Sequence, residues 1–204
     1  MKPLRLSAPL CLLTLFCSSP ALAVDGTITI TGEITDQTCK IDGNLPPHNI
    51  MVTLPRIGAS ALRSNGETAG ATVFTIRVTD CPSALTGQLK LYFEPGSTTD
   101  YGTGNLIAYK EAAPSEAAGS IPDRSAAMVF QNVQIQLANL DGSTIRLGEP
   151  LATQNAKSVA LVATSGATTK EATLRYLARY VRVSDNTLNA GKVVSYVQYS
   201  VVYP

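Results

Sequence analysis

The stretch that decides the fold is the last one in the chain, SYVQYSVVYP, residues 195–204. Every second residue of this stretch is apolar or aromatic: Val197, Tyr199, Val201 and Tyr203. Alternation of β-branched and aromatic residues with a period of two predicts a strand, here one that runs to the chain's end. Because termini usually fray, a terminal strand with a large apolar face needs a partner lying along it.

Similar β-rich runs recur along the chain, separated by turn signals such as Asn65-Gly66 and Asp141-Gly142. The predicted strands are 27–34, 50–55, 72–81, 88–95, 105–110, 128–140, 158–163 and 173–181, besides the last run. No window sustains a helical period, and a turn or two near 59–63 is the best helix candidate. Many short strands with frequent turns predict an all-β sandwich, with residues 111–123 as a surface loop.

The chain begins with features of a secretory signal. Lys2 and Arg5 precede the apolar run PLCLLTLFC, and SSPALA follows as a small-residue cleavage site. The apolar run is shorter than the roughly 20 residues that span a bilayer, so a membrane anchor is disfavoured. We therefore expect residues 1–23 to be removed on export.

Residues 24–204 are enough for one domain with a real core. The formal net charge of the whole chain is +1, and loss of two basic residues with the signal makes it −1. A nearly neutral chain has no general electrostatic attraction for nucleic acid or anionic membranes.

Two cysteines, Cys39 and Cys81, remain after the signal is removed. An even pair in an exported chain predicts a disulfide, because oxidising compartments favour it. Closing this loop would stabilise the fold by roughly 4 kcal/mol on the chain-entropy model. Two unpaired buried thiols are the alternative interpretation.

A search for catalytic constellations finds none. His48 is the only histidine, and its Pro-rich surroundings LPPHN favour a solvated side chain. A zinc site would have too few of its usual ligands, and no G-x-S-x-G or S-x-x-K motif is present. YGTGN, residues 101–105, lacks the third glycine of a dinucleotide fingerprint and predicts a turn. We therefore expect no catalytic residue, no metal and no cofactor.

The beginning of the exported chain, VDGTITITGEI, is a second strand-like terminus. One face holds Ile28, Ile30 and Ile34 with Gly32 between them, while threonines and Glu33 occupy the other face. An apolar strand next to an unpaired edge invites association with another chain. The segment therefore closes either its own sandwich or that of another molecule.

With these features the chain resembles the structural pilins of the bacterial chaperone-usher pathway. Tyr203 is penultimate and Gly191 lies fourteenth from the end, as in the C-terminal pattern of that family. GETAGATVFTIRVTDC, VQIQLANLDGSTIRLGEP and LRYLARYV are similar to three further family segments, in the same order. Within the family, the sequence is most similar to those of the Bordetella serotype fimbrial subunits.

The resemblance implies an incomplete immunoglobulin-like β-sandwich that a donor strand from a neighbouring subunit completes. It divides the chain into a signal peptide (1–23), a donor-strand extension (24–35) and a pilin domain (36–204). The residues that it implies for the donor strand are Ile28, Ile30, Gly32 and Ile34, and those for the chaperone and groove strand are Gly191, Val197, Tyr199, Val201 and Tyr203.

The expected function is that of a structural subunit of an adhesive fimbria on the bacterial surface, not an enzyme. The resemblance implies as partners identical or related pilins, a periplasmic chaperone, an outer-membrane usher and a host-cell receptor. The alternatives are a minor or adaptor pilin and a monomeric periplasmic β-sandwich that binds or carries a ligand.

Overall fold

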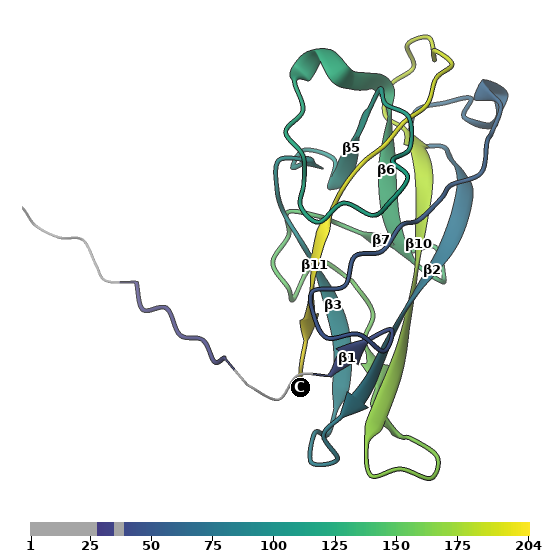
Figure 1. The fold of residues 1–204 in the computed structure, drawn as a ribbon. Coiled ribbons are helices and arrows are strands. Elements are labelled where there is room, and N and C mark those ends of the chain that lie inside the picture. Colours follow the sequence, from purple (N-terminus) through teal and green to yellow (C-terminus); the bar gives the residue numbers. More distant parts are fainter. Residues whose placement is uncertain (1–27, 35–38) are drawn as a thin grey trace, which may run out of the picture. The chain divides into compact units, whose positions relative to one another are not determined.

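The computed structural model describes residues 28–34 and 39–204, which belong to two units, Met1–Thr35 and Asp36–Pro204 (Figure 1). The predicted signal peptide lies outside the described residues. In the first unit, residues 28–34 carry no helix or strand, and Ile28, Ile30 and Ile34 are 90, 90 and 101% exposed. The alternation predicted a strand here, but a strand needs a partner to supply its ladder of hydrogen bonds.

The regular secondary structure of the second unit consists almost wholly of strands, joined by turns and loops. In chain order they are β1 (Lys40–Ile41), β2 (Thr68–Cys81), β3 (Gln88–Glu94), β4 (Thr99–Asp100), β5 (Asn105–Tyr109), β6 (Val129–Asn139), β7 (Thr144–Ile145), β8 (Val159–Ala160), β9 (Val162–Ala163), β10 (Lys170–Arg182) and β11 (Gln198–Val202). Two single 3₁₀ turns, Ala59–Ala61 and Ala126–Met128, are the helical elements among the described residues. None of the described residues forms a helix that is long and apolar enough to cross a membrane.

The larger sheet has the order β1-β2-β10-β6-β5-β4, with β7 added to β6 and β9 to β10. Its long central strands, β2, β10 and β6, pair in antiparallel register, with Leu174 opposite Ile76 and Tyr180 opposite Ile135. Alternate residues of these strands point into the core, as the two-residue period of a half-buried strand requires.

The smaller sheet has the order β11-β3-β8 and packs against the larger one. Its central strand contributes the buried side chains Leu89, Leu91 and Phe93. Phe93 meets Tyr176 of the opposite sheet edge to face, with ring centroids 5.5 Å apart. The all-β sandwich predicted from the sequence is therefore confirmed.

Turn chemistry also agrees with the sequence. Gly66 and Gly142 adopt positive φ angles of 85° and 84° at the two predicted turns, where a side chain would strain the backbone. Residues 101–104 form a turn, and Tyr176 and Tyr180 lie on a strand, both as predicted.

Within the second unit, two further predicted strands differ from the structure. Residues 158–163 form two short strands, because β8 pairs with β3 of the small sheet whereas β9 pairs with β10 of the large sheet. Residues 50–55 form no strand. Their side chains nevertheless alternate between partly buried and exposed. The sequence pattern therefore predicted which side chains are buried, but it wrongly predicted that the backbone is hydrogen-bonded to another strand.

Candidate functional site: an open groove beside the last strand

The last strand, β11, lies at an edge of the smaller sheet. It pairs with β3 from Gln198 opposite Glu94 to Val202 opposite Lys90, and no other described strand pairs with it. Tyr199 and Val201 pack toward the core, whereas Gln198 and Ser200 are exposed. β11 therefore presents one free backbone edge together with a row of apolar side chains.

A second wall faces this edge. It is formed by residues 46–54, which include most of the Pro-rich LPPHN stretch and the residues from 50 onward that form no strand. The partly buried side chains of Ile50, Val52 and Leu54 pack against the core. The two walls are joined at one point, where the Tyr199 hydroxyl donates a hydrogen bond of 2.7 Å to the carbonyl of His48. We call the space between β11 and residues 46–54 the groove.

The groove has a volume of about 820 Å³ and reaches down to the hydrophobic core. Core side chains from both sheets form its floor: Phe74, Ile76, Phe93, Leu106, Ile135, Leu137 and Ala178. A sandwich normally covers such side chains with a strand or a loop, since apolar surface exposed to water costs about 25 cal/mol per Å². The shape and the chemistry of the groove suit an extended chain with apolar side chains on one face.

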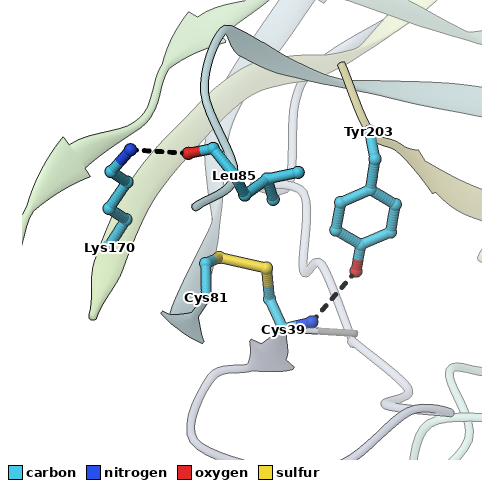
Figure 2. The surroundings of a disulfide bond; sticks show 5 residues. All are labelled: Cys39, Cys81, Leu85, Lys170 and Tyr203. Atoms are coloured by element: carbon cyan, nitrogen blue, oxygen red, sulfur yellow. Dashed lines mark hydrogen bonds between the residues drawn. A yellow bond between two sulfur atoms is a disulfide. The ribbon is translucent and has the colours of Figure 1, made fainter. Parts of the chain in front are cut away.

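The disulfide predicted between Cys39 and Cys81 is confirmed, and it lies beside Tyr203, a residue at one end of the groove (Figure 2). Both cysteines are fully buried, and the bond joins the start of the second unit to the end of β2. The backbone N–H of Cys39 donates a hydrogen bond of 3.2 Å to the Tyr203 hydroxyl. The C-terminal residues are thereby held beside the beginning of the second unit.

Alkylation of the exported protein tests this bond. We expect no label on Cys39 or Cys81 without a reductant and two labels after reduction. Replacing both cysteines by serine should lower the free energy of unfolding by about 2–5 kcal/mol, as for other small secreted domains. Labelled thiols in the unreduced exported protein would contradict the assignment.

Three tyrosines near the groove are shifted in their ionisation. Burial raises the pKa of Tyr176, Tyr180 and Tyr199 above the ordinary value of 10.0, and the Asp42 carboxylate raises that of Tyr199 further. Because the pKa values of these tyrosines are raised in the folded state, the protonated side chains contribute to the stability of the fold. This contribution is present in full below pH 10 and is lost as the pH rises beyond it.

We expect some of the eight tyrosines to ionise only above pH 10, together with a loss of folded structure. Absorbance of the phenolate and circular dichroism, recorded in one alkaline titration, measure both. Ionisation of all eight near pH 10 in a protein that stays folded would contradict the burial of these side chains.

Four of the five residues predicted for the groove strand line the groove, and Gly191 does not. Val197, Tyr199, Val201 and Tyr203 line the groove, although only Tyr199 and Val201 belong to β11 itself. Gly191 lies before the strand and is not among the lining residues. A Cβ atom there would lie 2.8 Å from Cε2 of Phe130, so that close packing requires glycine.

Sequence reasoning missed the second wall and the loop that reaches the groove. Residues 50–55 were predicted as a strand without a role, and residues 113–121 of the predicted surface loop contribute to the lining. The alternation of residues 50–54 was the available signal for the wall. For the loop, composition gave none, because its alanines, serines and prolines are typical of any exposed connection.

The groove offers no catalytic arrangement among its described residues. His48, predicted to be solvated, is instead partly buried, with Nε2 3.6 Å from Oδ2 of Asp42. No group of three His, Cys, Asp or Glu residues in the described part could hold a metal ion. What the site provides is a shaped apolar surface beside a free strand edge, which is a surface for binding.

Comparison with known proteins now gives the family. The family model described as type-1 fimbrial protein, A, matches residues 54–204, which include β11 and, of the opposite wall, its last residue, Leu54. The chain belongs to this family of fimbrial subunits. It is 49% identical to the serotype 3 fimbrial subunit of Bordetella pertussis over 91% of this chain and 90% of that protein.

The serotype 2 fimbrial subunit of the same organism is 45% identical over 92% of this chain and 90% of that protein. A chain from a solved chaperone-usher pilus matches 91% of this chain and 100% of its own length, with a TM-score of 0.51 and 14% identity. The fold is therefore the immunoglobulin-like sandwich of chaperone-usher pilins. The protein is a structural subunit of a fimbria, a surface filament, and its family is not one of enzymes.

Proposed function

We propose that the groove receives a donor strand from the N-terminal extension of another subunit, and that repetition of this step builds the fimbria. The observation that carries the proposal is the groove itself, with core side chains at its floor and a free strand edge along one wall. Adding a strand to a sheet edge is a general mode of recognition, in which main-chain hydrogen bonds give affinity and alternate side chains give register.

The chain contains a segment of the required chemistry. Residues 28–34 have three bulky side chains of one parity, Ile28, Ile30 and Ile34, all exposed in the single chain. Burial of three isoleucines contributes on the order of 5–9 kcal/mol before any ladder hydrogen bonds are counted. Gly32, at the fourth position of that face, suits a place where the floor of the groove is shallow.

A contact in which the extension of one copy fills the groove of the next does not close on itself. A growing filament then keeps one unused extension at one end and one unused groove at the other, so head-to-tail addition produces an open filament. A strand from a periplasmic chaperone occupies the groove before assembly, and an outer-membrane usher carries out the exchange. The extension begins at residue 24, after removal of the signal peptide 1–23.

Recovery of the filaments tests the proposal. Filaments sheared from the cell surface should be visible by electron microscopy, and peptide mass measurement should identify this chain as their main component. The first recovered residue should be Val24. A secreted protein that remains a stable monomer in size-exclusion chromatography, with no filaments, would contradict the proposal, and low copy number in a filament would indicate a minor or adaptor subunit.

A further inference from the structure

The loop between β5 and the second 3₁₀ turn, residues 111–124, is closed at its base by an ion pair. Arg124 Nε donates a hydrogen bond of 2.9 Å to Oε2 of Glu111, and Nη2 donates to the same oxygen. The Arg124 side chain is only 13% exposed. A guanidinium that is held by two hydrogen bonds to one carboxylate fixes the base of the loop more firmly than an ordinary surface ion pair.

This loop contacts the wall of the groove formed by the chain leading into β11. Arg124 Nη2 donates a hydrogen bond of 3.1 Å to the Tyr196 hydroxyl, and the guanidinium carbon lies 5.4 Å from the centre of the tyrosine ring. The Tyr196 carbonyl in turn accepts a hydrogen bond of 2.6 Å from Thr98. The loop is therefore tied to the point where the chain enters its last strand.

The loop also reaches the other wall. A Cβ atom on Gly119 would lie 4.0 Å from the side-chain nitrogen of Asn49, which belongs to residues 46–54. The loop thus extends from one wall to the other near the beginning of β11. Tyr203 and Cys39 mark the opposite end of the groove. At 3.3 Å per residue, Tyr203 lies about 23 Å from Tyr196 along the strand direction. In Figure 1 the loop lies at the end of the sandwich away from β1 and the C-terminus.

We propose that the exposed part of this loop, residues 112–116, is a contact surface for the folded domain of the next subunit, a second copy of this chain. The inference rests on the proposed function. Every ladder among the described strands is antiparallel, so an inserted strand continues the sheet best when it runs antiparallel to β11. Its C-terminal residue, Ile34, then leaves the groove at the loop.

The short link between the donor segment and its own domain limits where the incoming subunit can lie. Only residues 35–38 separate Ile34 from Cys39, the first described residue of the pilin domain. Five fully extended residues span at most about 18 Å. The Cys39 end of the incoming subunit, which includes the turn at residues 82–87 beside the disulfide, must therefore lie close to the loop of the subunit that receives the strand.

The composition of the loop fits a close approach. Residues 112–116, Ala-Ala-Pro-Ser-Glu, are all exposed, and four of the five have small or rigid side chains that lose little entropy on contact. Because Arg124 holds the base, the surface is already ordered before the neighbour arrives. Preorganised surfaces lose less conformational freedom on association.

A photo-crosslinking amino acid at Ala113, with a second variant at Ser115, tests the contact in assembled filaments. Illumination should produce a ladder of covalent oligomers, and mass measurement should join the probe to peptides that contain residues 40–41 or 82–87. The control carries the probe at Thr173, an exposed position on the outer face of β10, and should not be joined to these peptides.

Filaments that form normally but give no such product from either loop position would overturn the inference while leaving strand donation intact. So would products that join the loop to a different face of the neighbour. Failure of the proposed function is recognised separately, because filaments would then still form when Ile30 is replaced by aspartate, and both proposals would fall together.

Discussion

Replacing Ile30 by aspartate is expected to abolish surface filaments while the subunit itself still accumulates in the periplasm. Under the proposed function, Ile30 enters the groove of a neighbouring subunit, and a charge placed on that apolar floor costs several kcal/mol. The pilin domain of the donor molecule should be unaffected, because residues 28–34 supply no strand to its own two sheets. Its disulfide and its complex with the chaperone should form as in the parent.

A matched control is available one residue away. Thr29→Asp introduces the same charge in the same segment on the opposite face of the predicted donor strand. This variant should assemble at close to the level of the parent. Immunoblots of the periplasm, with electron microscopy of the same cells, measure subunit and filament together. If Ile30→Asp lowers both, the segment completes its own domain and the donor-strand proposal is wrong.

Truncation after Gln198 should have an effect of similar size on the subunit itself. It removes Tyr199, Val201 and Tyr203, and with them nearly all of the pairing of β11 with β3. Phe93 and its neighbours on β3 then lose their cover. We estimate a loss on the order of 5 kcal/mol, which is comparable to the whole stability of many domains.

The truncated subunit is therefore expected to be degraded in the periplasm even when the chaperone is present. Ser200→Ala is the control, because Ser200 is exposed and its hydroxyl donates a hydrogen bond to the Glu94 carboxylate of the neighbouring strand without packing into the core. That variant should accumulate normally. Pulse-chase labelling of periplasmic extracts measures the lifetimes, and an equal lifetime for the truncated chain would contradict the role given to the last strand.

The alternation at the C-terminus correctly predicted which side chains of the last strand face the core. Tyr199 and Val201 face the core as expected, since a strand with β-branched and aromatic residues on one face has few other ways to bury them. The sequence did not predict where pairing begins. Gln198 is the first paired residue because its partner Glu94 is the last residue of β3, and Pro95 follows with no N–H to donate.

Other features depend on contacts that the sequence does not encode locally. β1, β4 and β7 have two residues each, too few for any period to be seen. Residues 50–54 have the pattern of a strand but lack a partner in the single chain, so only the structure separates burial from pairing. The Arg124 to Tyr196 hydrogen bond joins residues 72 positions apart, and no local pattern announces it.

The cysteine pair was accessible from the sequence because the compartment limits the choices, with two cysteines left after the signal. The link between Cys39 and Tyr203 was not, although both residues had been singled out for separate reasons. That hydrogen bond brings the first and last parts of the pilin domain to one end of the groove. It therefore marks the end of the groove that lies away from the loop at residues 111–124.

Cryo-electron microscopy of the intact filament would show strand donation itself. Density for residues 28–34 of one subunit is expected in the groove of the next, between β11 and residues 50–54. This density should run antiparallel to β11, with Ile30 pointing toward the core. Density that traces the segment into the groove of its own subunit, or a groove filled by residues 111–124 instead, would rule out donation of residues 28–34 between subunits.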